Sequence, residues 1–351
     1  MEKSDIMSFD IDELCEEMSK IGEKSFRGKQ IYEWLHVKLV SDFEEMTNLS
    51  KNLKDKLNNN YIINMPKIVE VYKSKIDGTR KYLFQLYDGS IIESVLMKYK
   101  HGNSVCISSQ VGCRMGCKFC ASTLDGLERN LLPSEMIGQI YAIQKDLGER
   151  ISNIVIMGSG EPFDNYDNFL KFVNLITSEK GLNISSRNIT VSTCGLVDRI
   201  KQLADMKLQI TLAISLHATT DEVRKTIMPV ANKYKISQII DACKYYFQQT
   251  GRRITFEYSL IEGVNDSEES ALELINLVKG LNCHINLIPV NPIKERNFRH
   301  SSMEYIKNFQ NILEKNRINA TIRREMGADI NAACGQLRKR YIDDKKNINK
   351  K

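Results

Sequence analysis

Three cysteines stand close together in one short stretch of this chain, Cys113-Arg-Met-Gly-Cys117-Lys-Phe-Cys120. Crowded thiolates are soft ligands, and they select zinc or an iron–sulfur cluster. A structural zinc site needs a fourth Cys or His, but the next cysteine is Cys194 and no histidine precedes it in this interval. The spacing therefore favours a [4Fe–4S] cube with one iron that has no protein ligand. A degenerate zinc knuckle is the alternative.

An iron without a protein ligand is free to bind a small molecule. This arrangement is used to cleave S-adenosylmethionine (SAM) reductively. The cysteine loop is therefore the first candidate site, and the remainder of the chain must position it.

Strands and helices alternate after residue 100. We expect strands at 104–109, 153–157, 188–193, 209–216, 253–261, 284–290 and 319–324, and helices near 133–147, 165–178, 196–206, 236–250, 267–280 and 303–316. This repetition predicts a parallel sheet, either a barrel or an open doubly wound fold. In such folds the chemistry lies in loops at the carboxyl ends of the strands.

Glycines and polar residues recur where the predicted strands end. They include Gly158, Gly160, Glu161, Ser192, Cys194, Gly195, Ser215, Leu216, His217 and Asn291. Turns favour the same residue types, so any one of these positions could be a turn residue and nothing more. Because all of them follow strands on the edge that carries the cysteine loop, the set together predicts one shared site.

The first third of the chain has a different pattern. Residues 1–66 are expected to form a small helical domain, and residues 67–98 a meander of three strands joined by two Asp-Gly turns. Arg27 and Lys29 stand beside Tyr32 and Trp34, a mixture that suits RNA because cations meet phosphate and rings stack on bases. The apolar members of this segment could instead be the core of the domain.

Three further residues are candidates for chemistry. Glu93 interrupts an apolar run in the meander, where a carboxylate facing water is the ordinary explanation. Cys106 shares a strand face with Ser104 and Ser108, opposite the apolar face, and could be a core cysteine. Cys334 is flanked by small residues between two glycines, which predicts a reactive thiol in a loop.

Composition sets outer limits on function. The 351 residues carry a net charge of +6, which permits RNA or DNA as a partner without requiring either. Nine cysteines, three of them in one loop, indicate reduced thiols and metal chemistry. The acidic N-terminus lacks an apolar signal region, and no apolar run could span a bilayer. We therefore expect a cytoplasmic protein with no membrane association, acting as a monomer.

Segments along nearly the whole chain resemble the dual-specificity RNA adenine-C2 methyltransferases of the radical SAM superfamily. The resemblance is carried by FRGKQIYEWL, CISSQVGCRMGCKFCAS, GSGEP, SLHATTDEVRKTIMPV, EGVND and DINAACGQL. It implies an α/β fold, a partial (βα)6 radical-SAM barrel over residues 99–330. It also implies that residues 1–66 contact RNA, that the meander at 67–98 is a linker, and that residues 331–351 form a loop with a catalytic cysteine and a basic tail.

The resemblance also implies the cofactor sites. Cys113, Cys117 and Cys120 would bind a [4Fe–4S] cluster whose open iron takes the amino and carboxylate groups of SAM. The remainder of SAM would be held by Gly160, Glu161, Ser192, Ser215, Leu216, His217 and Asn291. Ser159 and Cys194 depart from the pattern of the family, in which Met and either Ser or Val are commoner, and neither is assigned a ligand role.

The implied reaction methylates carbon 2 of an adenine in the peptidyl transferase centre of 23S rRNA and in the anticodon loop of tRNA. One SAM would methylate Cys334, and a second would be cleaved to a radical that takes hydrogen from the new methyl group, which then adds to the ring. Cys106 would attack the sulfur of Cys334 and release the product as a disulfide forms, while Glu93 accepts the ring proton. Flavodoxin or ferredoxin would supply electrons.

Two other functions remain open from the sequence. A related methyltransferase that modifies carbon 8 of the rRNA adenine and confers antibiotic resistance would share the cluster and both cysteines. FRGKQIYEWL and the following DFEEMTNLSK look closer to the carbon-2 group. A non-enzymatic RNA-binding module with structural zinc would instead be colourless and free of sulfide, and it gives no reason for Cys334.

Overall fold

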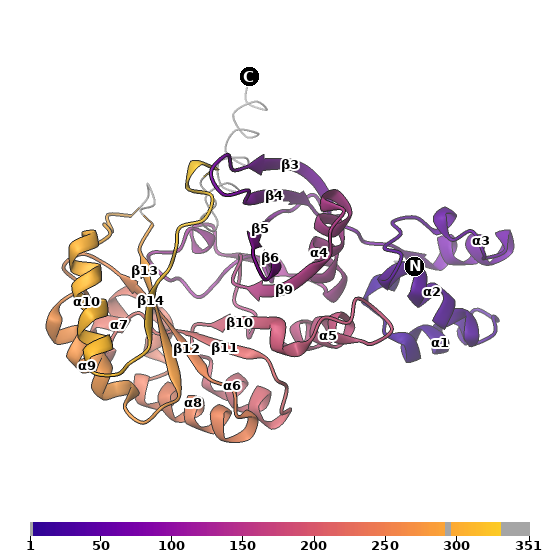
Figure 1. Cartoon of the computed structure of the whole chain (residues 1–351). Coiled ribbons are helices and arrows are strands. Elements are labelled where there is room, and N and C mark those ends of the chain that lie inside the picture. The colour runs from indigo at the N-terminus through magenta and orange to yellow at the C-terminus, as the bar shows by residue number, and fades with distance from the viewer. Residues whose placement is uncertain (1–2, 292–295, 331–351) are drawn as a thin grey trace.

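The main sheet of the protein is curved and ten-stranded (Figure 1). The computed structural model describes residues 3–291 and 296–330. The parallel strands are β6 (Gly102–Cys106), β9 (Ile151–Ile156), β10 (Ile189–Thr193), β11 (Thr211–Ser215), β12 (Ile254–Leu260), β13 (Cys283–Pro289) and β14 (Ala320–Ile322). They lie in chain order across the sheet, as expected when each crossover returns beside the strand it left.

A helix follows each of these strands except the last. The crossover helices are α4 (Pro133–Leu147), α5 (Tyr166–Thr177), α6 (Val197–Asp205), α8 (Ile236–Thr250), α9 (Glu268–Val278) and α10 (Met303–Lys315). They cover the outer face of the sheet (Figure 1). The predicted partial (βα)6 radical-SAM barrel is confirmed.

Alternation along each strand separates the core from the interior of the barrel. In β12, Phe256 and Tyr258 are fully buried, and the Tyr258 ring lies 5.4 Å from that of Phe309 in α10. Glu257 and Ser259 of the same strand therefore point to the opposite, inner face. Both line an inner cavity. The apolar half of each strand thus builds the core, and the other half is free to carry polar side chains.

The predicted meander forms and continues the barrel sheet. Its strands are β3 (Lys67–Lys73), β4 (Arg80–Gln85) and β5 (Ile91–Tyr99), paired antiparallel. Strand β5 also pairs antiparallel with β6, so that Val95 lies opposite Cys106. The meander is therefore more than a linker, because it brings Glu93 into the wall of the barrel.

The N-terminal segment is helical, as expected, with α1 (Ile11–Lys20), α2 (Phe26–His36) and α3 (Lys51–Asn60). Short strands β1 (Ser4–Asp5) and β2 (Tyr61–Ile62) pair beside these helices. Tyr32 and Leu35 are buried in the core of this segment, whereas Phe26 is 48% exposed. His36 Nδ1 lies 2.8 Å from the Tyr141 hydroxyl of α4, which ties the segment to the barrel. None of the helices in the described ranges is long and apolar enough to cross a bilayer.

Candidate active site

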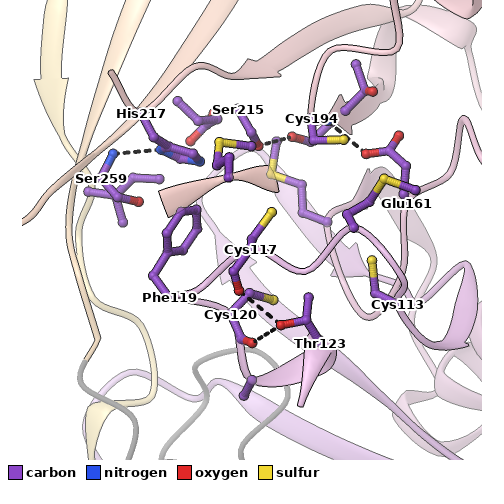
Figure 2. A pocket seen from close by; sticks show the side chains of 18 of the residues that line it. Cys113, Cys117, Phe119, Cys120, Thr123, Glu161, Cys194, Ser215, His217 and Ser259 are labelled. Atoms are coloured by element: carbon purple, nitrogen blue, oxygen red, sulfur yellow. Dashed lines mark hydrogen bonds between the residues drawn. The ribbon is translucent and has the colours of Figure 1, made fainter. Parts of the chain in front are cut away.

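One cavity of about 250 Å³ opens at the carboxyl ends of the parallel strands. Its walls contain most of the residues that the sequence singles out: Cys113, Cys117, Cys120, Gly160, Glu161, Ser192, Ser215, His217 and Asn291. Figure 2 shows the three thiols along one side of this space, with Glu161, Ser215 and His217 across from them. Leu216 does not line it, because its side chain is buried in the core. The strand-end residues therefore converge, as their shared edge requires.

A small hairpin that was not predicted from the sequence flanks the cysteine loop. Strands β7 (Gln110–Gly112) and β8 (Leu127–Asn130) pair antiparallel on either side of the loop. The Cys113 N–H donates to Gly126 O at 2.8 Å, which closes the base of the loop. The Thr123 hydroxyl lies 3.0 Å from Cys117 O and 2.9 Å from Cys120 O. The loop is thus held in shape by its own chain.

The chemical state of the three thiols fits a metal cluster. Burial raises the pKa of Cys113 to about 12, and burial also raises the pKa of Cys117 and of Cys120. A bound metal replaces the proton and removes this penalty. Within the described ranges, no three Cys, His, Asp or Glu side chains converge on one ion. A cube does not require such convergence, because each thiolate binds its own iron.

Glu161 is a buried carboxylate with a fixed orientation. Its Oε2 accepts the Cys194 N–H at 2.8 Å, and its Oε1 accepts the Phe163 N–H at 3.0 Å. Gln110 Oε1 accepts the N–H of Glu161 at 2.8 Å. Burial raises the pKa of this carboxyl group, although the hydrogen bonds to it act in the opposite direction. The result is a positioned acceptor in the wall across from the thiols.

His217 offers one ring nitrogen to the cavity. Its Nδ1 accepts the Ser259 N–H at 2.9 Å, and burial lowers the pKa of His217 to about 3. The imidazole is therefore neutral and carries its hydrogen on Nε2. The ring of Phe119 packs edge-on against it at 4.8 Å. His217 is thus a neutral donor held between β12 and the cysteine loop.

A second cavity, of about 460 Å³, lies against the meander. Glu93 and Cys106 both line it. The residues that line both cavities are Met157, Gly158, Glu257, Ile288, Asn291 and Arg323. Because the two cavities share this wall, groups bound in them would be neighbours.

The structure corrects the water-facing explanation of Glu93. The carboxylate is 4% exposed, and its Oε2 lies 3.0 Å from the Nζ of Lys81, which is fully buried. Lys81 stands two residues before Leu83, which pairs with Glu93, so both charged side chains project from the same face of the sheet. A buried ion pair is costly to maintain unless something else requires it, which indicates a function for this carboxylate.

Cys106 projects from the inner face of the sheet. Its strand neighbours Val105 and Ile107 are fully buried in the core. Burial raises the pKa of the Cys106 thiol. All eight cysteines in the described ranges are free thiols. The predicted partner Cys334 lies outside the described residues, so the transient disulfide between Cys106 and Cys334 stays a prediction.

Two charged groups of the inner wall were not foreseen from the sequence. Glu257 is 5% exposed and accepts a hydrogen bond from Asn286 Nδ2 at 2.8 Å. The other group is Lys81. Glu257 is a lone charge in an apolar strand, the same signal that singled out Glu93, whereas Lys81 follows Arg80 directly and carries no such signal.

Two family models and several known proteins match this chain. The model of the radical SAM superfamily matches residues 107–275, and the model of the ribosomal RNA large subunit methyltransferase N-terminal domain matches residues 4–63. The chain is 64% identical to a probable dual-specificity RNA methyltransferase RlmN from Lachnoclostridium phytofermentans, over 97% of this chain and 96% of that protein. A protein of the same description from Clostridium novyi is 58% identical, over 96% and 98% of the two chains.

A solved structure agrees over the whole described architecture. The chain is similar to a radical SAM methyltransferase from Sphaerobacter thermophilus, with a TM-score of 0.91 and 42% sequence identity. The match covers 95% of this chain and 98% of the other. It therefore includes the N-terminal helices and the meander as well as the barrel.

Proposed function

The chain belongs to the RlmN family of dual-specificity RNA methyltransferases in the radical SAM superfamily, and we propose that its smaller cavity holds the cofactors while the neighbouring larger cavity holds the RNA base. The protein is a radical SAM RNA methyltransferase whose cofactors are a [4Fe–4S] cluster and SAM. A zinc-containing binding module does not fit this family. The observation that carries the proposal is the wall that the two cavities share.

Cys113, Cys117 and Cys120 are the proposed cluster ligands. Their thiols are the soft donors that iron–sulfur clusters use, and they line the smaller cavity from one loop. When bound, the cluster and SAM together supply a carbon-centred radical. The fixed carboxylate of Glu161 would accept a hydrogen bond from the amino group of SAM. Ser192, Ser215, His217 and Asn291 present further hydrogen-bonding groups to the same space, and Leu216 acts indirectly, because its backbone bonds to Glu257 and Arg224 hold the end of β11 in place.

In the larger cavity, Cys106 is the proposed thiol group and Glu93 is the proposed proton acceptor. Carbon 2 of adenine carries no acidic hydrogen, so a methyl group is added there by a radical route through the thioether of Cys334. Cys106 then attacks the sulfur of Cys334, so that an S–S bond forms as the S–C bond breaks, and the carbon keeps the electron pair of that bond and gains a proton to become the methyl group of the released base. The unpaired electron of the ring would return to the bound cluster, which the cleavage of SAM leaves oxidised. Glu93 takes the proton that leaves the ring, and Lys81 holds its carboxylate in place. Met97 and Tyr99 offer apolar surface to the base in the same cavity.

Replacing Glu93 with glutamine is expected to slow RNA methylation by a factor on the order of 10² to 10⁴, because a general base is lost while the side-chain shape is kept. Methylation of Cys334 should continue, since it precedes proton removal. The matched control is Glu149→Gln, which removes an exposed carboxylate that pairs with Lys98. Single-turnover assays by nucleoside mass spectrometry measure the effect. Equal rates for the two variants would remove Glu93 from the mechanism.

Replacing Gly160 with alanine is expected to weaken SAM binding at least about tenfold, or about 1.4 kcal/mol. Gly160 has φ +106, and a Cβ there would lie 2.6 Å from Gln110 Cβ and 2.7 Å from Gln110 N. Displacement of this backbone would move the adjoining Glu161. Gly148→Ala is the control, because Gly148 also has positive φ but no atom within 4 Å of the added Cβ. Calorimetric titration of each cluster-loaded variant with SAM measures the affinity. An unchanged affinity in Gly160→Ala would refute the assignment of Gly160 to the SAM site.

The proposed substrates are an adenine in 23S rRNA and one in tRNA. The test is anaerobic reaction of the reduced, cluster-loaded protein with SAM and each RNA, followed by nucleoside mass spectrometry. We expect 2-methyladenosine in both RNAs. Formation of 8-methyladenosine would favour the antibiotic-resistance relative, and methylation of a single RNA class would refute dual specificity for this chain.

The remaining proposals concern the surroundings of the enzyme. The cluster needs a reductant, for which flavodoxin or ferredoxin is suitable because each carries single electrons at low potential. We propose that the protein acts as a monomer in the cytoplasm, where RNA and these carriers occur. The N-terminal helices, which match the methyltransferase N-terminal domain, would contact RNA through Arg27 and Lys29.

A further inference from the structure

One arginine is enclosed in the protein behind the cysteine loop. Arg224, in α7 (Asp221–Ile227), is 0% exposed. Its Nε donates to Leu216 O at 3.0 Å, and its Nη2 donates to Cys194 O at 2.7 Å and Ser215 O at 3.1 Å. Its Nη1 is buried and has no hydrogen-bond partner among the described residues. The guanidinium therefore joins the ends of β10 and β11 with one nitrogen left over.

No carboxylate of the described residues forms an ion pair with Arg224, although the charge of Asp221 on the same helix acts favourably on it. Among the ion pairs of the described ranges, none includes this side chain. The acid on its own helix, Asp221, instead accepts the Ile236 N–H at 2.8 Å. Carbonyl groups satisfy hydrogen bonds but supply no net charge. A buried cation without a directly paired carboxylate is unfavourable, so another negative group is expected nearby when the cofactors are bound.

The cysteine loop is the neighbour that can supply it. The Lys118 N–H donates to Ile227 O at 2.9 Å, which joins the loop to the end of α7. Cys117 and Cys194 pack in one buried cluster with Ile227 and Met228. The charge of Arg224 acts on the sulfurs of both cysteines. Arg224 does not line the cofactor cavity, so it acts across the wall and does not contact SAM.

We propose that Arg224 is the buried counter-charge of the iron–sulfur cluster and makes that cluster easier to reduce. This inference rests on the cluster assignment proposed above. Three thiolates give an oxidised cube a net negative charge, and the incoming electron makes it more negative. A fixed cation in a site of low dielectric stabilises the reduced form more than the oxidised form. Arg224 is thus a positioning and tuning residue, which sets the potential without touching substrate.

The test is the midpoint potential of the cluster in Arg224→Met and Arg224→Lys. Each cluster-loaded variant is titrated with reductant in the absence of SAM, and the reduced cluster is measured by electron paramagnetic resonance. Methionine keeps the apolar bulk and removes the charge. The reduced-to-oxidised ratio at a fixed potential should fall about tenfold, which is 59 mV for a one-electron couple. Lysine should stay close to the wild type, because it keeps the charge and loses the fork of hydrogen bonds.

Arg114→Met is the matched control. Arg114 also lies in the cysteine loop, but its side chain is 63% exposed and pairs with Asp164. Solvent screening and this carboxylate should leave its effect small. An unchanged potential in Arg224→Met would overturn the proposal. Equal shifts in the Met and Lys variants would also overturn it, because they would show a role in loop geometry alone.

If Arg224→Met binds the cluster too poorly for its potential to be measured, a second measurement tests the proposal. The thermal stability of the apo and cluster-loaded forms is compared for the wild type and for Arg224→Gln. A counter-charge predicts that the substitution lowers the melting temperature of the loaded form more than that of the apo form. Equal losses would show a structural brace and refute the proposal. Loss of iron in Cys117→Ala tests the cluster assignment separately, so the two failures are distinguishable.

Discussion

Replacement of Cys117 by alanine is expected to abolish RNA methylation and to strip the protein of its iron and sulfide. The proposed cluster has three protein ligands, and removal of one leaves two irons of the cube without a protein ligand. Loss of this ligand should release the cluster, because the two cysteines that remain in the loop cannot hold it. Iron and sulfide analysis after anaerobic reconstitution, with the visible absorption spectrum, measures the outcome. Full cluster content in Cys117→Ala would contradict the assignment.

Cys194→Ala is the matched control for this experiment. Cys194 is 5% exposed and lines the same cavity as the three loop cysteines. Its N–H is bonded to Glu161 and its carbonyl to Arg224, and both bonds survive truncation of the side chain. We therefore expect normal iron content, which distinguishes this variant from Cys117→Ala. An equal loss of iron in this variant would identify Cys194 as a fourth ligand and leave no open iron for SAM.

Replacement of Cys106 by alanine is expected to stop product release and to accumulate RNA bound covalently to the protein. Formation of the new carbon–carbon bond needs only Cys334 and the cofactors, whereas release needs a second thiol that attacks the Cys334 sulfur. Denaturing gels and mass spectrometry should find an adduct that survives denaturation, and free methylated RNA should fall to background.

Cys283→Ala provides the comparison for Cys106. Cys283 is more shielded than Cys106, at 9% exposed, and packs in the main hydrophobic core. It should lose some stability, methylate RNA normally and form no adduct. Full methylation by Cys106→Ala would show that another group releases the base. Absence of both product and adduct in that variant, with Cys334 still methylated, would place Cys106 before the bond-forming step.

The barrel was predictable because its elements have strong periodicity. The helix expected near 133–147 coincides with α4, and the helix expected at 236–250 coincides with α8. The small elements were missed for a physical reason. Strand β7 spans Gln110–Gly112 and α7 spans Asp221–Ile227, and neither is long enough to display a repeat. Their form depends on contacts with the rest of the barrel.

The site was predictable where chain topology alone decides position. Residues at strand ends must share one edge, so Ser192, Ser215 and Asn291 were found from the pattern. Pairing across the sheet decides the remainder. From residue type alone the ordinary explanation of Glu93 was a carboxylate that faces water, and only the resemblance made it a proton acceptor, yet the continuation of the meander into the barrel turns it inward beside Lys81. No local pattern contains that information, since β4 and β5 would look the same in a free-standing hairpin.

Mass spectrometry of the peptide that carries Cys334 tests whether this cysteine is the methyl carrier. The protein should be purified from cells with ample iron, together with Cys113→Ala prepared in the same way. We expect a methyl group on the Cys334 sulfur in the wild type and none in Cys113→Ala, because methylation of the carrier needs the cluster-loaded site. An unmodified Cys334 in protein with a full cluster would contradict the methyl-carrier mechanism.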